Sequence, residues 1–452
     1  MIQMKHNNLP IAIIGGGPVG LATASHLTKR NIPFILFEAG QSVGQNILSW
    51  SHVRVFSPWK YNIDSASKEL LEQTNWVAPN EDGLPTGKEL VKQYFRPLAN
   101  LPQIKPHIYL NSKVLSIERK GLDKMKTWGR EDKPFSIKVE ENGSTKYYEA
   151  KAVIDATGTW NQPNPIGSGG VSAEGEEALK NHIFYGIPNV KADHLERYKN
   201  KSIAVVGGGH SAINTLLELA DVQKKYPNTK LNWILRKDNL EKVYGGKQDD
   251  ALEARGALGI RIEQLVNSGK LNVYTPFHIL KLTKNENGIQ IIGNLNDEIE
   301  VINGIDEIIS NTGSRPNLDM IREVRVALDS SLESVFDLAD LIDPNIHSCG
   351  TVRPHGEKEL RHPEKDFYIV GSKSYGRAPT FLMATGYEQV RSVVAYLASD
   401  VEASEKVELN LPQTGVCSSN IGDKSQSTSC CAPESVLVEA NEGSICGASG
   451  CG

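Results

Sequence analysis

The sequence contains the same short pattern twice, a run of apolar residues that leads into three consecutive glycines. The first copy reads IIGGGPVG at residues 13–20, and the second reads VVGGGHSAIN at residues 205–214. Apolar residues at helical spacing follow the glycines in both copies. The pattern therefore predicts a buried strand, a glycine turn and a helix, twice in one chain. This repeat restricts the chain to the α/β class with two Rossmann-like dinucleotide-binding domains.

The first glycine loop has the spacing G-x-G-x-x-G in Gly15, Gly17 and Gly20, with Pro18 inside the motif. In this motif the first glycine makes a tight turn, the second lets a pyrophosphate approach the backbone, and the third lets the helix pack on the strand. The following apolar segment, PFILFEAG, ends in Glu38, which is placed to accept hydrogen bonds from ribose hydroxyls. The first loop therefore predicts a dinucleotide site.

The second loop repeats the spacing as G-x-G-x-x-A in Gly207, Gly209 and Ala212, with Ser211 at the predicted start of the helix. The next apolar segment, KLNWILRK, brings Arg236 to the position where the first loop has an acid. A cation there suits the 2′-phosphate of NADP, whereas an acid would repel it. We therefore expect a second dinucleotide, NADPH, at this loop.

The overall charge and hydropathy of the chain exclude several other classes of protein. The 452 residues carry a formal net charge of -5 without a long Lys/Arg run, so nucleic acid is not an expected partner. No apolar stretch is long enough for a membrane helix, and the N-terminal residues MIQMKHNN lack the features of a signal peptide. We expect a cytoplasmic protein that has no membrane partner and can form a homo-oligomer.

Three further segments extend the resemblance to a known superfamily. AKAVIDATGTWNQPNPI (residues 150–166) and DEIISNTGSRPN (306–317) each end an apolar strand in a Thr-Gly turn, and DFYIVGSKSYGRAPTF opens a later strand, glycine turn and helix. With the two glycine loops, these segments resemble the flavoproteins that bind FAD and NADPH in two dinucleotide folds. The resemblance implies further cofactor-binding residues in these segments, namely Thr157, Gly158, Thr312, Gly313, Gly371 and Ser372.

The same resemblance implies how the chain is organised. The NADPH domain, residues 169–339, is expected to be inserted into a discontinuous FAD domain made of residues 1–168 and 340–400. Residues 401–452 are rich in Ser, Gly, Asn and Glu, and we expect them to form a flexible tail. The chain has six cysteines, and the tail carries Cys417, Cys430, Cys431, Cys446 and Cys451.

Within this superfamily the chain is most similar to flavin-containing monooxygenases. SWSHVRVFSPWKYN (49–62) stands where those enzymes have a segment along the flavin ring, and HIFYGIPNVKADHLERY matches part of their signature before the second loop. The resemblance implies an FAD-dependent, NADPH-oxidising monooxygenase that uses molecular oxygen and a C4a-hydroperoxyflavin. Its small-molecule substrate would be a soft nucleophile centred on sulfur, nitrogen or a related heteroatom. By its place in the first segment, Asn62 is a candidate residue at the flavin face.

Two alternatives depend on the cysteines. A reductase of disulfides or thiol-bound metalloids would need a thiol pair, but residues 1–348 contain no cysteine, so electrons would leave through Cys430 and Cys431 of the tail. Cys349 is then the candidate partner for exchange with the tail. A protein of a different class would bind metals or sense redox state through the tail thiolates. The tail contains no histidine, which excludes mixed Cys/His zinc ligation within it, and we predict no metal site.

Overall fold

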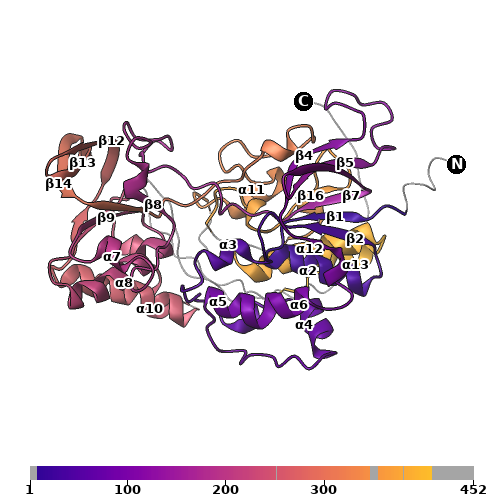
Figure 1. Ribbon diagram of the computed structural model, residues 1–452, viewed down its shortest axis with the longest axis horizontal. Coiled ribbons are helices and arrows are strands. Elements are labelled where there is room, and N and C mark those ends of the chain that lie inside the picture. The colour runs from indigo at the N-terminus through magenta and orange to yellow at the C-terminus, as the bar shows by residue number, and fades with distance from the viewer. Residues whose placement is uncertain (1–7, 251, 347–354, 380, 410–452) are drawn as a thin grey trace, which may run out of the picture. The chain divides into compact units, whose positions relative to one another are not determined.

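The computed structural model describes residues 8–250, 252–346, 355–379 and 381–409, and Figure 1 shows their arrangement into sheets and helices. A five-stranded parallel sheet forms around the first glycine loop, with the strand order β16-β7-β1-β2-β3. Its strands are β1 (Ile11–Ile14), β2 (Phe34–Phe37), β3 (Ile108–Tyr109), β7 (Ala152–Asp155) and β16 (Phe367–Ile369). We call residues 8–158 and 355–409 the first unit.

A second five-stranded parallel sheet forms around the second glycine loop, with the order β11-β10-β9-β15-β8. Its strands are β8 (Ile183–Tyr185), β9 (Ser202–Val206), β10 (Lys230–Ile234), β11 (Asn272–Tyr274) and β15 (Glu307–Ser310). We call residues 183–310 the second unit. The prediction of an α/β protein with two Rossmann-like folds is confirmed.

Each unit also carries a three-stranded antiparallel sheet. In the first unit it consists of β4 (Ser112–Arg119), β5 (Phe135–Glu141) and β6 (Ser144–Ala150). In the second it consists of β12 (Phe277–Asn285), β13 (Gly288–Leu295) and β14 (Glu298–Ile305). The antiparallel strands come between β3 and β7 in the first unit and between β11 and β15 in the second.

Helices lie against the parallel sheets, and in Figure 1 α8 and α10 lie on the opposite side of the second sheet from β12–β14. The helices of the first unit are α2 (Pro18–Lys29), α3 (Gln45–Leu48), α4 (Ser65–Glu72), α5 (Gly87–Glu89), α6 (Arg96–Ala99), α12 (Met383–Leu397) and α13 (Val401–Glu405). A π-helical stretch, Leu90–Phe95, joins α5 to α6. The helices of the second unit are α7 (Leu195–Tyr198), α8 (His210–Lys225), α9 (Glu241–Tyr244) and α10 (Glu253–Asn267), and α11 (Ala339–Ile342) lies between the units in sequence.

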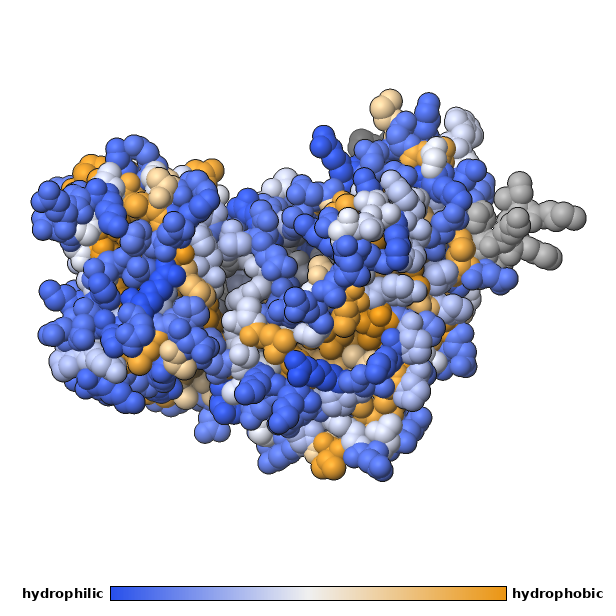
Figure 2. Space-filling view, in the orientation of Figure 1, coloured by the Kyte–Doolittle hydropathy of each residue, from blue (hydrophilic) through white to orange (hydrophobic). Residues whose placement is uncertain are grey.

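The cores follow from the apolar strands that the sequence placed before each glycine loop. All residues of β1 are buried, and so are Ile203 to Val206 of β9, as expected for parallel strands covered on both faces. The outer surface is different, because hydrophilic residues cover most of the face shown in Figure 2. Within the described residues, no helix combines the length and the apolar character that crossing a bilayer requires.

Two stretches pack differently from the expected domain boundaries. Residues 311–339 were expected in the inserted domain, yet Val324 and Val335 are fully buried in the core of the first unit. The β-strands of the second unit end at Ser310, and the chain after it returns to the first unit. Residues 401–405, which were expected in the tail, form α13, whose N-cap Asp400 also pairs with Arg30 at 2.9 Å. The chain is therefore ordered past the predicted start of the tail.

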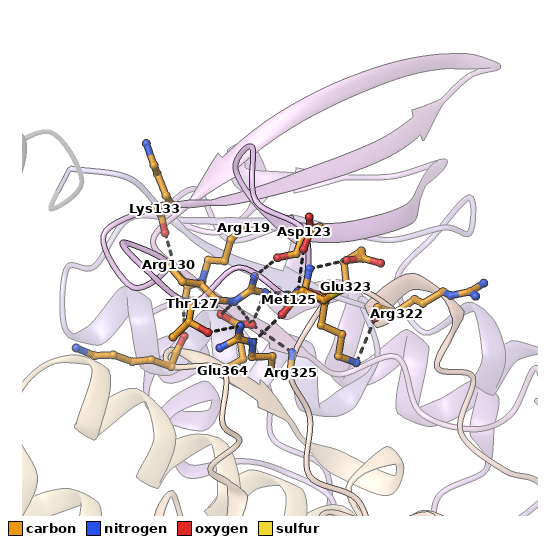
Figure 3. A network of polar contacts seen from close by, with 12 residues as sticks. Arg119, Asp123, Met125, Thr127, Arg130, Lys133, Arg322, Glu323, Arg325 and Glu364 are labelled. Carbon is orange, nitrogen blue, oxygen red and sulfur yellow. Dashed lines mark hydrogen bonds and ion pairs between the residues drawn. The ribbon is translucent and has the colours of Figure 1, made fainter.

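A buried ionic cluster joins the antiparallel sheet of the first unit to the segment that precedes β16 (Figure 3). Glu364 accepts hydrogen bonds from Nε of Arg119 at 2.7 Å and from Nη2 of Arg130 at 2.6 Å. The main-chain N–H of Arg325 donates to the same carboxylate at 3.2 Å. Burial raises the pKa of Glu364, but the arginine hydrogen bonds outweigh burial and hold it below its usual value. The cluster thus fixes segments that are far apart in the chain.

Candidate functional site

The first glycine loop forms an open cradle at the start of α2. Gly15 has a φ of +103°, and a Cβ there would lie 2.8 Å from the carbonyl oxygen of Ala156. A Cβ at Gly20 would overlap the carbonyl oxygen of Gly15, whereas one at Gly17 would meet nothing within 4 Å. Gly17 caps α2 without a side-chain hydrogen bond, so the first N–H groups of the helix are free for an anion. This geometry fits the pyrophosphate of a dinucleotide.

Glu38 lies beside this cradle at the end of β2. Its Oε2 accepts a hydrogen bond from the N–H of Gly16 at 2.7 Å, and its Oε1 accepts one from Gly40 at 2.7 Å. Burial raises the pKa of Glu38, and the two backbone hydrogen bonds partly oppose that shift. The carboxylate is thus held next to the loop, at the place where a ribose would lie.

Two distant turns meet beside the first loop, at the carboxyl ends of β7 and β16. Gly158 has a φ of +69°, and a Cβ there would lie 3.3 Å from the hydroxyl oxygen of Ser372. Gly371 has a φ of +70° and its N–H donates to Oε1 of Gln389. The fold therefore brings the turns at residues 157–158 and 371–372 to one edge of the first sheet, where ligands bind in open α/β sheets.

A fully buried ion pair underlies these turns, and sequence reasoning missed it. Nζ of Lys373 donates to Oδ2 of Asp155 at 2.7 Å and to the hydroxyl of Thr157 at 3.2 Å. The Thr157 hydroxyl donates in turn to Oδ1 of Asp155 at 2.7 Å. The side chains of Lys373 and Asp155 are 1% and 0% exposed, so water does not weaken the pair. No local spacing in the sequence relates the two residues, so no pattern could have identified them.

Asn62 has a different role from the one expected at the flavin face. The residue is 1% exposed, and its amide nitrogen donates to the carbonyl oxygens of Ser57 and Pro58. Its side-chain oxygen accepts from the hydroxyl of Ser57, and its carbonyl accepts from Tyr387. Because these bonds use the polar atoms of the side chain internally, Asn62 holds the 57–62 turn rather than facing a ligand.

The second glycine loop has the same geometry as the first. Gly207 has a φ of +133°, and a Cβ there would overlap the carbonyl oxygen of Asn311. At Gly209 a Cβ would meet nothing within 4 Å, and α8 begins after it without a side-chain cap. Ala212 is fully buried at the third position of the motif. This loop also fits the pyrophosphate of a dinucleotide.

A cavity of about 720 Å³ opens at the second loop and extends to the first unit. Of the predicted cofactor-binding residues, the lining contains Gly207, Gly209, Ser211, Arg236, Thr312, Gly313 and Ser372. The first unit also contributes apolar side chains, including Phe56, Phe381 and Leu382, and Trp160 lies on the segment that connects the units. Thr312 joins two of the connecting segments, because its hydroxyl donates to the carbonyl of Asn164 at 2.7 Å.

The charges of the cavity wall have one sign. Its ionisable lining residues, apart from His210 and Tyr185, are Arg236, Lys237, Lys242, Arg255 and Arg377, and no Asp or Glu among the described residues lines the cavity. A basic wall of this kind attracts and retains anionic ligands. The cavity therefore suits a phosphate-bearing dinucleotide.

His210 is the first residue of α8 and lies under the open loop. Burial, with a smaller contribution from Arg255, lowers the pKa of His210 to about 4. The imidazole is therefore neutral at pH 7, and its ring packs 5.2 Å from that of Phe56 of the first unit. An anion at this helix end meets backbone N–H groups rather than a charged histidine. No pattern in the sequence predicted the contact with Phe56.

The predicted catalytic cysteines Cys349, Cys430 and Cys431 lie outside the described residues. All of the cysteines fall in undescribed segments, so the described part of the chain contains none.

Comparison with known proteins relates this chain to a family of flavoenzymes. The family model described as "Pyridine nucleotide-disulphide oxidoreductase" matches residues 12–341. The ferredoxin–NADP reductase of Lactococcus lactis subsp. cremoris (strain SK11) is 27% identical over 341 residues, covering 72% of this chain and 82% of the relative.

Solved structures show the same fold at low sequence identity. The bacillithiol disulfide reductase Bdr of Bacillus cereus has a TM-score of 0.62 at 19% identity, covering 86% of this chain and 99% of that one. The cadaverine monooxygenase DfoA of Erwinia amylovora, bound to FAD, has a TM-score of 0.62 at 12% identity, covering 91% and 99%. The fold is therefore shared by reductases and monooxygenases alike.

Proposed function

The chain belongs to the pyridine nucleotide-disulphide oxidoreductase family and is a flavoprotein oxidoreductase that uses FAD and NADPH, and we propose that it acts as a monooxygenase on a small soft nucleophile. FAD fits the first glycine loop, where Gly17 leaves the backbone open and Glu38 is held at the ribose position. NADPH fits the second loop. The family match confirms both cofactor predictions.

The observation that carries the proposal is the cavity between the second glycine loop and the first unit. It joins the basic NADPH side, including Arg236, to an apolar wall that contains Trp160, Phe381 and Leu382. The basic side binds the phosphates of the nucleotide. The apolar side excludes water from the place where electrons pass to the second substrate. A single cavity thus supports both half-reactions.

In this proposal the chain binds, orients and shields. FAD, when bound, supplies the two-electron chemistry between NADPH and the second substrate. The α2 N-terminus and Glu38 would hold its pyrophosphate and ribose, and the buried Lys373–Asp155 pair fixes the turn at Thr157. Overall, NADPH, a proton, O₂ and the substrate would give NADP⁺, water and the substrate with one added oxygen atom.

The test uses the purified full-length protein with FAD, NADPH, air and a dialkyl sulfide or primary amine as probe. We expect NADPH oxidation that rises with the probe, oxygenated product in a ratio near one per NADPH, and little hydrogen peroxide. Stoichiometric peroxide without oxygenated product for any sulfur or nitrogen probe would overturn the monooxygenase proposal. Deletion of residues 412–452 is expected to leave NADPH oxidation intact.

A reductase is the second candidate, and the curated relatives favour it. Proteins named ferredoxin–NADP reductase align with most of this chain at 27% identity or less. On this alternative the electrons of NADPH pass to an external acceptor, and oxygen is not required. The same protein under nitrogen, with an iron–sulfur protein, a disulfide or a thiol-bound metalloid as acceptor, separates the two candidates. Anaerobic turnover with one of these acceptors would favour the reductase, and collapse of that turnover in the 412–452 deletion would assign it to the tail cysteines.

A further inference from the structure

Two arginines from different units meet in the cavity. Arg236 follows β10 in the second unit, and Arg377 follows the turn at Gly371–Lys373 in the first unit. Both line the cavity, and Nη1 of Arg236 donates to the carbonyl oxygen of Ser168 at 2.8 Å. A Cβ at Gly170 would lie 3.9 Å from Nη2 of Arg377. The two guanidinium groups are therefore gathered around the 167–170 segment.

The main chain of Arg377 is fixed, but its guanidinium has no counter-charge in the described part of the chain. Its N–H donates to the carbonyl oxygen of Leu332 at 2.7 Å. Among the described residues no carboxylate pairs with its side chain. The neighbouring Arg315 differs, because its Nε donates to Asn164 at 3.0 Å and its Nη1 lies 3.5 Å from Glu333. Arg377 is thus held in place with its charge facing the cavity.

The two unneutralised charges repel each other. Partial burial lowers the pKa of Arg236, and the charge of Arg377 lowers it further. No acidic residue in the part of the chain that the structure describes lines the cavity to compensate. Such a pair is favourable only when an anion bridges it, and a phosphate monoester offers two negative charges and three acceptor oxygens to two guanidinium forks.

We propose that Arg377 and Arg236 together bind one phosphate monoester, the 2′-phosphate of NADPH, as a clamp shared by the two units. This inference rests on the proposed use of NADPH and adds to it a specificity-determining residue from the flavin-binding part of the chain. The clamp is assigned to the 2′-phosphate rather than to the pyrophosphate because of the position of Arg236. This residue follows the second strand of its Rossmann fold, and the end of that strand lies at the 2′ position of the adenosine ribose. The pyrophosphate remains with the loop at Gly207 and Gly209.

The clamp is tested by measuring binding of 2′,5′-ADP and 5′-ADP to the full-length, FAD-loaded protein by calorimetry. The wild type should bind 2′,5′-ADP more tightly. Arg377→Ala should weaken binding of 2′,5′-ADP by about tenfold or more, as for loss of a charged hydrogen bond, and leave 5′-ADP within about twofold. Arg377→Lys should restore part of the loss. The matched control is Arg261→Ala on α10, an exposed arginine outside the cavity lining, which should change neither affinity.

A double mutant tests whether both arginines contact the same phosphate. If they do, Arg236→Ala with Arg377→Ala should lose less affinity for 2′,5′-ADP than the product of the single losses, because the second removal acts on a phosphate already released. Unchanged discrimination between 2′,5′-ADP and 5′-ADP in Arg377→Ala would overturn the clamp. The flavin content and thermal midpoint of each variant verify that it is folded.

Inorganic phosphate distinguishes a nucleotide subsite from a separate phosphate site. The clamp predicts that phosphate competes with 2′,5′-ADP in the wild type. If Arg377→Ala weakens phosphate binding but leaves 2′,5′-ADP unaffected, the arginine serves another phosphate ligand and the clamp is wrong. Failure of the wild type to oxidise NADPH would instead overturn the proposed function, so the two failures are distinguishable.

Discussion

The two units of this protein share one plan and differ in where they keep their charges. Each has a five-stranded parallel sheet and a three-stranded antiparallel sheet, and each begins α2 or α8 at an uncapped glycine loop. The outermost strand is different in origin, because β16 returns from the end of the described chain whereas β8 precedes the second loop. The first unit is therefore closed only after the second has been completed.

The first unit contains ion pairs that are almost fully buried, namely Lys373–Asp155 and Glu364 with its two arginines. The cavity at the second unit is lined by cations, and no Asp or Glu of the described residues lines it. One of these cations, Arg255, is buried in an ion pair with Asp250, whereas Lys281 forms an exposed pair with Glu174 of the connecting segment. The open basic cavity suits a ligand that carries phosphates.

The largest effect is expected from breaking the buried cluster of Figure 3. Glu364→Gln leaves Arg119 and Arg130 buried without a counter-charge, which should lower the free energy of unfolding by about 3 to 5 kcal/mol. The matched control is Glu174→Gln, whose partner Lys281 is exposed, with an expected loss below about 1 kcal/mol. Chemical denaturation followed by flavin release and circular dichroism measures both. Equal losses would remove the contrast between the buried and the exposed ion pairs.

A second test exchanges the residues at the third position of the two glycine motifs. Gly20→Ala introduces a Cβ that overlaps the carbonyl oxygen of Gly15, which should cost about 2 to 3 kcal/mol and release FAD. Ala212→Gly should cost about 1 kcal/mol through helix propensity and leave the flavin bound. Flavin content after gel filtration and the unfolding midpoint are the measurements. A Gly20→Ala protein that keeps its FAD would show that the two loops differ less than their contacts imply.

The third test concerns the acid at the end of β2. Glu38→Gln replaces a carboxylate that accepts two backbone hydrogen bonds, at Gly16 and Gly40, by a side chain with a single acceptor oxygen. Loss of one charged hydrogen bond predicts weaker FAD binding by about 2 kcal/mol, or roughly thirtyfold. NADPH affinity should not change. Equilibrium dialysis of FAD measures the first and calorimetry the second, and an equal effect on both ligands would contradict the assignment of Glu38 to the first site.

Local spacing predicted the parts of this architecture that lie within one strand–turn–helix segment. The glycine loops and Glu38 belong to such segments, and the structure places each at the end of its strand. Glu364 with Arg119, and Lys373 with Asp155, are separated by 245 and 218 residues, so no period in the sequence relates them. Arg377 carries no local signal either, since only the return of the chain to the first unit brings it to the cavity. Asn62 illustrates the reverse error, because its place in a resembling segment did not show that its own turn uses its hydrogen bonds.

The smallest expected effect is on the pH dependence of the free energy of unfolding. It tests whether a buried histidine in each unit contributes equally to that dependence. Burial lowers the pKa of His210 in the second unit and of His362 in the first to about 4. Between about pH 6.5 and pH 4 these histidines are protonated in the unfolded chain but neutral in the folded protein. The free energy of unfolding is therefore undiminished above about pH 6.5 and falls as the pH drops toward 4. His210→Gln removes at most one proton taken up on unfolding. The slope of the free energy of unfolding against pH should therefore fall by at most about 1.4 kcal/mol per pH unit, and His362→Gln should have a similar effect. Urea unfolding at pH 7 and pH 5 measures the slope. A variant with the wild-type slope would mean that its histidine is protonated in the folded protein.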